Sequence, residues 1–357
     1  MKAHIQNQKL TIKNININDP DALDKIHEQA YDKKVIEIDL SGNQIGELPF
    51  VLIDFILLKT VRKLNLSNNL LTTLPGYIRE NKNLKEIKLE GNPLISPPPE
   101  IIKKGTQSIL DYLKKPMSQK ELASILDKAA AAKVKLLDLS ERKIEKIPKN
   151  ICNLTELEVL KLNNNKIRSL PVGIVELNNL RKLELLGNRL TSFPIEIIHL
   201  PNLEVLTLES NSIKTLPPAI QLMTSLKELS LTANDLVLLP SEIGQLTNMV
   251  KLEILFNRLT SLPPEIGNLK GLRALFLDHN EITYLPSEIG HLKKLKILGL
   301  FGNKLSSLPP EFSQLKSLTE LDIRDNCIER FASGKLLQKT KREPLFYTHK
   351  LQFVVKR

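Results

Sequence analysis

Histidine and cysteine, the side chains that most often bind metals or attack substrates, are few and scattered in this sequence. The two cysteines, Cys152 and Cys327, lie 175 residues apart and form neither a ligand pair nor a disulfide framework. The six histidines, at positions 4, 27, 199, 279, 291 and 349, lack the HExxH spacing of a zinc enzyme. Phosphate-binding glycine motifs are absent as well. We therefore expect no catalytic residue, no metal and no cofactor.

Asparagine is the polar residue with a regular spacing. From Asn165 to Asn326 one Asn recurs every 23 residues, each after an apolar-x-apolar triplet such as Leu160-Lys161-Leu162. An Asn amide both donates and accepts, so it can satisfy backbone groups in a turn, and stacked copies predict an Asn ladder. The ladder positions are Asn43, Asn69, Asn92, Arg142, Asn165, Asn188, Asn211, Asn234, Asn257, Asn280, Asn303 and Asn326.

The residues around each ladder position predict one strand and one return segment. Leucines that alternate with polar residues indicate a short strand, and strands at equal spacing stack in parallel. Pro then begins the return, Ile and Leu point back into the core, and Gly is expected to end a short helical turn. The pattern predicts parallel strands at twelve sites, with leucine and ladder Asn as structural residues.

The full unit reads L-x-x-L-x-L-x-x-N-x-L-x-x-L-P-x-x-I-x-x-L-x-x, and residues 240–246, "PSEIGQL", show its outer part clearly. It resembles the 23-residue leucine-rich repeat of intracellular and bacterial proteins, including Ras-group arrays. The resemblance implies an α/β solenoid with a curved parallel sheet on the concave side, a short helical or irregular convex side, and helical caps. It also implies a non-enzymatic scaffold for protein recognition in signalling, with a small GTPase or a host protein as partner.

An interruption at residues 97–140 divides the repeats. Residues 92–113 resemble a terminal cap, and a capping box at Ser118-Gln119-Lys120-Glu121 begins a second amphipathic helix. Two fused arrays explain this order, whereas one continuous solenoid with a helical insertion is the alternative. The predicted divisions are an N-terminal cap with a helix (1–34), a three-repeat array (35–93), a helical cap and linker (94–133), a nine-repeat array (134–331) and a basic C-terminal segment that forms an atypical cap (332–357).

The positive charge favours an alternative function. The net charge is +11, and residues 332–357 hold seven Lys and Arg against one Glu. Such a tail could bind nucleic acid or an anionic membrane, although the repeats lack the interleaved aromatic residues that would support nucleic acid binding. Neither a signal peptide nor a membrane span is apparent, so we expect a cytoplasmic monomer. Export by a signal-less route, as an effector that binds a host protein, remains open.

One group of outward-facing residues breaks the polar pattern of the repeats. Positions −6, −4, −2 and −1, counted from each ladder Asn, should face out of the concave sheet. In three consecutive repeats these positions hold apolar residues together with one histidine. The predicted partner-binding residues are Leu255, Phe256, Phe276, His279, Ile297 and Phe301. An exposed apolar patch with aromatic residues is typical of an interaction site, although such side chains can also simply pack on one another along a sheet.

Overall fold

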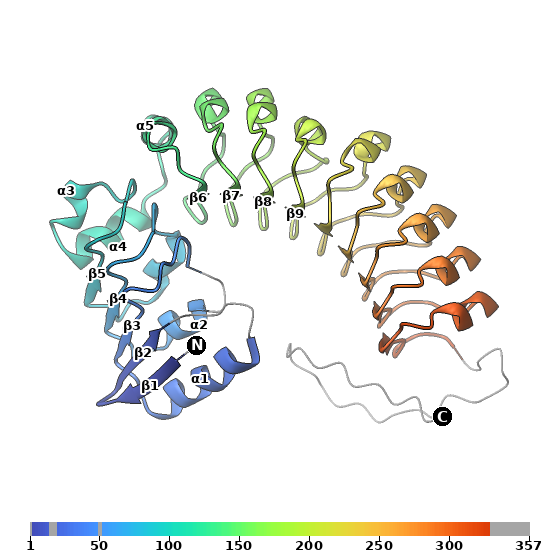
Figure 1. The fold of residues 1–357 in the computed structure, drawn as a ribbon, viewed down its shortest axis with the longest axis horizontal. Coiled ribbons are helices and arrows are strands. Elements are labelled where there is room, and N and C mark those ends of the chain that lie inside the picture. The colour runs from blue at the N-terminus through green and yellow to red at the C-terminus, as the bar shows by residue number, and fades with distance from the viewer. Residues whose placement is uncertain (1, 14–19, 49–51, 329–357) are drawn as a thin grey trace. The chain divides into compact units, whose positions relative to one another are not determined.

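A computed structural model describes residues 2–13, 20–48 and 52–328, and the chain divides into two units, residues 1–166 and 167–357. All twelve predicted strand sites are confirmed. At each site the residues at positions −6 to −4 form a three-residue strand. Figure 1 labels these strands through β9 and shows the repeating strand-and-turn units that carry them.

The first unit contains a five-stranded sheet with the order β1-β2-β3-β4-β5. The strands of this sheet are β1 (Lys2–Gln6), β2 (Lys9–Lys13), β3 (Glu37–Asp39), β4 (Lys63–Asn65) and β5 (Glu86–Lys88). The unit also contains β6 (Leu136–Asp138) and β7 (Val159–Lys161), which pair in parallel with each other outside this sheet. Strands β1 and β2 form an antiparallel hairpin that the sequence pattern does not predict. The hairpin extends the parallel sheet at β3 and buries Leu10 and Ile12 completely.

Helices occupy the predicted N-terminal cap and the interruption, and one short helix, α2 (Ile53–Leu57), lies within the first array. The others are α1 (Pro20–Asp32), α3 (Pro99–Ile102), α4 (Thr106–Lys114) and α5 (Gln119–Ala131), with 3-10 turns η2 (Gly76–Glu80) and η3 (Lys149–Asn153). Helix α4 buries Ile109 and Leu113 in the core of the first sheet. Helix α5 begins at the predicted capping box, where the Glu121 N–H donates to the Ser118 hydroxyl at 3.2 Å. The domain boundaries themselves stay a prediction.

Two side chains and one backbone N–H from the first array cover the outer edge of β6. The Thr72 and Thr73 hydroxyls donate to the carbonyls of Leu136 (3.1 Å) and Asp138 (2.7 Å), and the Gly76 N–H donates to the Ser140 carbonyl at 3.2 Å. These bonds satisfy carbonyl groups that a strand edge would otherwise leave unpaired.

Arg142 occupies the ladder position of this first repeat and is only 2% exposed. Its guanidinium lies 4.7 Å from the centre of the Tyr112 ring and 3.6 Å from a Glu121 oxygen. The ladder residue of the repeat that follows the interruption thus faces cap residues, which explains why a long cation replaces the amide there.

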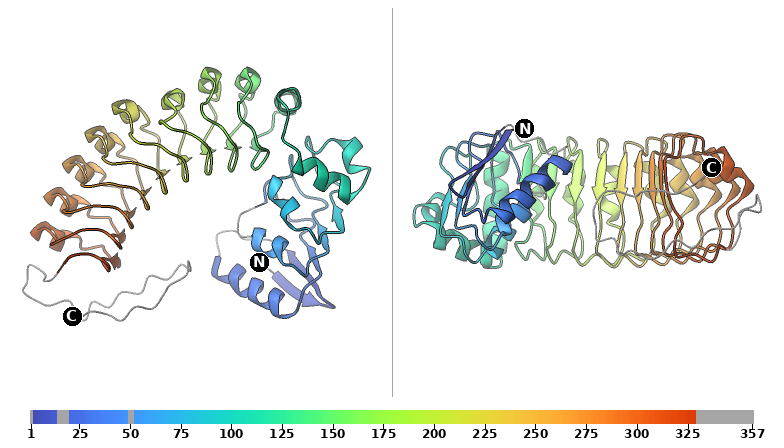
Figure 2. Two further views of the ribbon diagram at one scale, coloured as in Figure 1. Left: turned by 180° about the vertical axis from the view of Figure 1, so that it is seen from behind. Right: turned by 90° about the horizontal axis from the view of Figure 1, so that it is seen from below.

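The second unit repeats one strand and one 3-10 turn. Its described strands are β8 (Lys182–Glu184), β9 (Val205–Thr207), β10 (Glu228–Ser230), β11 (Lys251–Glu253), β12 (Ala274–Phe276), β13 (Ile297–Gly299) and β14 (Glu320–Asp322). Its 3-10 turns are η4 (Val172–Glu176), η5 (Ile195–His199), η6 (Pro218–Leu222), η7 (Ser241–Gln245), η8 (Pro264–Asn268), η9 (Ser287–His291) and η10 (Pro310–Gln314). These strands pair in parallel along the inner side of the unit, as the two views in Figure 2 show.

The ladder forms as predicted. The Asn280 amide donates to the carbonyls of Ile254 (2.7 Å) and Leu277 (3.0 Å) and accepts from the Leu259 N–H at 3.0 Å. Each ladder Asn in this unit therefore joins its own turn to the preceding repeat.

The glycine of the outer turns has a different role from the one predicted. Gly244 does not adopt a positive φ and so does not end the turn as a left-handed cap. A Cβ atom there would lie 2.5 Å from the Glu265 carbonyl oxygen, so glycine is needed for close contact between successive turns.

Residues 332–357, with their predicted cap, lie outside the described residues. Of the helices that are described, none combines the length and apolar character needed to cross a membrane.

Candidate functional site

The predicted outward positions share one face of strands β11, β12 and β13. The central residues of these strands, Leu252, Leu275 and Leu298, are fully buried. Their neighbours at positions −6 and −4 point to the opposite side because side chains alternate along a strand. Most of these neighbours are half-buried, and so are Leu255 and Phe301 at position −2.

Position −1 is a backbone corner in every repeat. All twelve residues at this position have a positive φ, between 51° and 74°. Seven of them are Gly, Asn or Asp, which adopt this conformation with the least strain. Phe256 (φ 51°) is a bulky exception, and His279 (φ 54°) occupies the next corner.

Two corner residues, Phe256 and His279, form one column of rings with Phe301 at position −2 of the next repeat. The Phe256 and His279 rings stack with their centres 4.3 Å apart and an angle of 14° between planes. The Phe301 ring meets His279 edge-on at 4.8 Å. Gly302 makes room for this contact, because a Cβ atom there would lie 2.9 Å from His279 Nδ1. The Phe256 side chain remains 41% exposed.

The other three predicted residues lie beside this column. Ile297 is paired in register with Ala274 on the neighbouring strand, and Phe276 is paired with Gly299. The Lys251 ammonium lies 5.9 Å from the centre of the Phe276 ring. Among the described aromatic rings, Phe276 contacts neither Phe256 nor Phe301, so the structure separates a ring column from a strand group.

A half-buried carboxylate, that of Asp278, lies beside these groups. Asp278 Oδ1 accepts the Phe301 N–H at 2.9 Å, and Gly299 makes room for the carboxylate, since a Cβ atom there would lie 2.2 Å from Oδ2. Burial raises the pKa of Asp278, and the nearby Asp322 carboxylate raises it further. Asp322, itself 5% exposed, pairs with Arg324, whose guanidinium lies 5.5 Å from the centre of the Phe301 ring.

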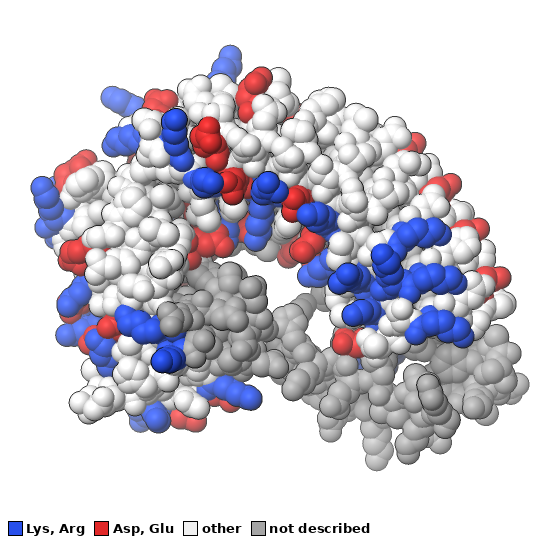
Figure 3. Space-filling model, viewed as in Figure 1, with Lys and Arg blue, Asp and Glu red and all other residues white. Residues whose placement is uncertain are grey.

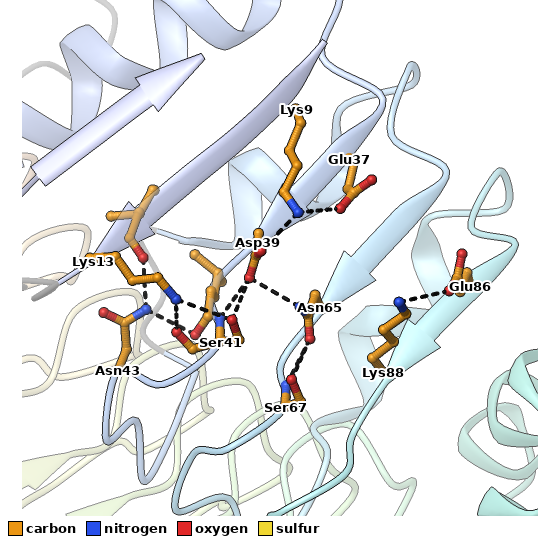
Figure 4. A network of polar contacts seen from close by, with 12 residues as sticks. Lys9, Lys13, Glu37, Asp39, Ser41, Asn43, Asn65, Ser67, Glu86 and Lys88 are labelled. Carbon is orange, nitrogen blue, oxygen red and sulfur yellow. Dashed lines mark hydrogen bonds and ion pairs between the residues drawn. The ribbon is translucent and has the colours of Figure 1, made fainter. Parts of the chain in front are cut away.

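The corresponding face of the first unit is polar, as Figure 4 shows. Lys9 bridges Glu37 (2.7 Å) and Asp39 (2.9 Å), and Asp39 Oδ1 accepts the Ser41 N–H at 3.0 Å. Burial alone would raise the pKa of Asp39, but the hydrogen bonds from Lys9 and Ser41 lower it to about 2. Polar groups satisfy one another here, which leaves the second unit as the candidate for apolar recognition.

Two features of the site are not predicted by the repeat pattern. One is the strained corner, for which the frequent Gly and Asn at position −1 were a signal. The other is a set of lysines and arginines that precede the strands of the same repeats. Across the described residues, no group of three or more His, Cys, Asp or Glu side chains is placed to hold a metal ion.

Comparison with family profiles identifies the repeats. A leucine-rich repeat region profile matches residues 176–278, and two further leucine-rich repeat profiles match residues 132–190 and 294–315.

Solved structures agree with these profiles. A leucine-rich repeat protein of Leptospira interrogans is 31% identical over 89% of this chain and 95% of its own, with a TM-score of 0.51. The ectodomain of an Arabidopsis thaliana membrane receptor kinase is 30% identical over 83% of this chain and 32% of its own, with a TM-score of 0.53. An internalin of Listeria monocytogenes, at 19% identity over 87% of this chain and 85% of its own (TM-score 0.51), shares the fold. With its ladder, its strand-and-turn units and these matches, the chain belongs to the leucine-rich repeat family.

Proposed function

We propose that this chain is a non-enzymatic scaffold that binds a protein partner through the concave face of its second unit. The binding surface is the aromatic patch, defined as Leu255, Phe256, Phe276, His279, Ile297 and Phe301.

The ring column carries the proposal. Phe256 is exposed and occupies a corner that favours Gly or Asn. A phenylalanine there strains the backbone, and its side chain does not compensate by filling the core. Aromatic side chains supply much of the energy of protein interfaces, and Phe256 offers one open ring face at little entropic cost.

The family supports protein recognition in general. Leucine-rich repeat proteins typically bind proteins or peptides, and the Arabidopsis receptor ectodomain was solved in complex with Casparian strip integrity factor 2. The resemblance of the 23-residue unit to Ras-group repeats makes a small GTPase the first partner class to assay, and a host protein the second. A cytoplasmic location belongs to the same proposal.

The experiment combines a photo-crosslinker with a triple substitution. Benzoylphenylalanine replaces Phe256 in one sample and Tyr284, an exposed ring that follows its strand and lies outside the patch, in the other. The crosslinked protein is identified by mass spectrometry, purified, and titrated against wild type and the Phe256→Ser, Phe276→Ser, Phe301→Ser variant.

We expect crosslinking at position 256 and little at position 284. The triple variant should lose at least tenfold in affinity for that protein, whereas Tyr284→Ser should retain it, because a few aromatic anchors carry most of an interface. A triple variant that is folded and binds with unchanged affinity would show that the patch is only packing along the sheet.

A further inference from the structure

The repeats that carry the aromatic patch also carry a strongly basic edge. Figure 3 shows Lys and Arg side chains gathered over one side of the second unit near its C-terminal end. In the sequence the segments that lead into β10–β14 hold seven basic residues and few acidic ones, and Lys251 at the start of β11 adds an eighth. The basic edge consists of Lys227, Lys251, Lys270, Arg273, Lys293, Lys294, Lys296 and Lys316.

Backbone hydrogen bonds align three of these residues, Lys227, Arg273 and Lys296, in one column with Val250. The Lys296 N–H donates to the Arg273 carbonyl and the Arg273 N–H to the Val250 carbonyl, both at 2.8 Å, and the Val250 N–H donates to the Lys227 carbonyl at 2.7 Å. Position −7 of successive repeats therefore forms a fixed column. Its members are one strand spacing apart, about 4.8 Å.

Most of this charge is uncompensated within the described residues. Lys227 pairs with Glu204 and Lys251 with Glu253, both at 2.9 Å. Within the described part of the chain, no ion pair involves Lys270, Arg273, Lys294, Lys296 or Lys316, and all five are exposed. Like charges at this spacing repel one another, so an anionic partner that approaches the edge lowers its electrostatic free energy.

The edge and the patch adjoin one another. Lys251 joins them directly, since its ammonium lies over the Phe276 ring and its strand position pairs with Ala274. Earlier in the same column, position −7 is Glu204, which pairs with both Arg181 (3.0 Å) and Lys227 (2.9 Å), so the unpaired basic residues of the edge lie in the repeats near the patch. An anion bound here would extend onto an apolar surface.

The charged and apolar residues of that surface also determine which class of anion can bind. The concave face beside the edge carries Glu209, Glu253 and Asp278 in addition to the apolar patch. These carboxylates would repel the evenly spaced phosphates of a nucleic acid laid across the strands. A polypeptide can place acidic side chains at the edge and apolar side chains on the patch.

We infer that the partner presents an acidic protein segment whose carboxylates bind the basic edge while its apolar residues contact the aromatic patch. The inference rests on the proposed function for the second contact. The first contact is tested on its own.

The test uses the full chain and three labelled probes of about equal negative charge: a peptide of about 16 residues with Glu and Leu, the same peptide with Ser for Leu, and a single-stranded oligodeoxynucleotide. Binding is followed by fluorescence anisotropy over a range of salt concentrations. Vesicles with phosphatidylserine in phosphatidylcholine are tested by co-sedimentation.

Two variants remove three charges each. The edge variant is Arg273→Gln, Lys294→Gln, Lys296→Gln, and the matched control is Lys335→Gln, Lys339→Gln, Lys341→Gln in the C-terminal segment. We expect the edge variant to lose about tenfold in affinity for the Glu-Leu peptide, with a shallower salt dependence, and the control to lose less than about twofold.

Equal losses in the two variants would overturn the inference, because net charge alone would explain them. It is also overturned if the oligonucleotide or the vesicles bind more tightly than the peptide through the edge, or if neither peptide binds at low salt. The Phe256→Ser, Phe276→Ser, Phe301→Ser variant separates the two proposals. If it binds the Glu-Leu and Glu-Ser peptides as wild type does, the patch fails and the edge stands.

Discussion

At the scale of single residues, Phe256 shows how the site departs from the repeat rule. A left-handed backbone costs a non-glycine residue roughly 1–2 kcal/mol, and Asn tolerates it better. The corner is held by the Phe256 N–H, which donates to the Asp278 carbonyl at 2.9 Å whatever the side chain.

We therefore predict that Phe256→Asn changes the free energy of unfolding by less than about 1 kcal/mol, because relief of strain offsets the lost ring contact of about 0.5–1.5 kcal/mol. Phe276→Asn is the control, since Phe276 lies in strand β12 and gains no such relief. Urea denaturation should rank Phe276→Asn as the more destabilised variant. The reverse order would contradict the strain argument.

Two aspartates on the strand faces should give opposite pH dependences. The pKa of Asp39 is lowered from 3.8 to about 2, so its ion pair stabilises the fold above pH 4 and this stability is lost as pH falls toward 2. The pKa of Asp278 is raised, so its charged form destabilises the fold, and stability decreases as pH rises above 3.8.

Asp39→Asn should accordingly lower the free energy of unfolding at pH 7, and its difference from wild type should shrink between pH 4 and pH 2. Asp278→Asn keeps the acceptor for the Phe301 N–H and removes a half-buried charge, so at pH 7 it should be at least as stable as wild type. Chemical denaturation across this pH range measures both. A destabilised Asp278→Asn at pH 7 would count against the assigned burial effect.

At the scale of elements, the ladder amides have a measurable share in stability. Asn280 makes three buried hydrogen bonds, so Asn280→Ala should cost roughly 1–3 kcal/mol by leaving partners unpaired. Asn248 is exposed and donates to a single carbonyl, at 2.9 Å from Thr224, and Asn248→Ala should cost less than about 0.5 kcal/mol. Similar losses in the two variants would mean that the ladder hydrogen bonds contribute no more to stability than an exposed side-chain hydrogen bond.

The covered edge of β6 gives a second prediction at this scale. Thr73 is buried and its hydroxyl donates to the Asp138 carbonyl at 2.7 Å. Thr73→Val keeps the shape and removes the donor, so it should cost about 1–3 kcal/mol. Thr72→Val, whose bond is partly exposed and 3.1 Å long, should cost less. Amide exchange in β6 should speed up more in the Thr73 variant.

At the scale of the whole molecule, the sequence predicts what depends on local repetition. The spacing of Asn280 and its equivalents places every strand of the repeats, and alternation around Leu275 identifies the residues that face outward. Contacts among those residues are not local. The His279 ring fits between Phe256 and Phe301 only because Gly302 lacks a side chain, and a linear pattern does not reveal that relation.

The hairpin and the glycine of the outer turns lie beyond prediction for similar reasons. Residues 2–13 contain no ladder Asn, so no repeat places them, although alternation at Leu10 and Ile12 was visible. Gly244 was expected to end a turn, but its role depends on the Glu265 carbonyl of the following repeat. Both features follow from packing between segments rather than from the segment itself.

Because the backbone corner is the same in all twelve repeats, the residues that bind a partner can be transferred from one repeat to another. Since φ at position −1 stays between 51° and 74° whatever the side chain, the residues displayed there can be exchanged without rebuilding a loop. Copying the outward residues of the repeats at Asn257, Asn280 and Asn303 onto those at Asn188, Asn211 and Asn234 should create a second docking place on the same backbone. A bivalent protein made in this way would bind two copies of the partner. Its avidity would show whether the two sets of repeats bind independently of each other.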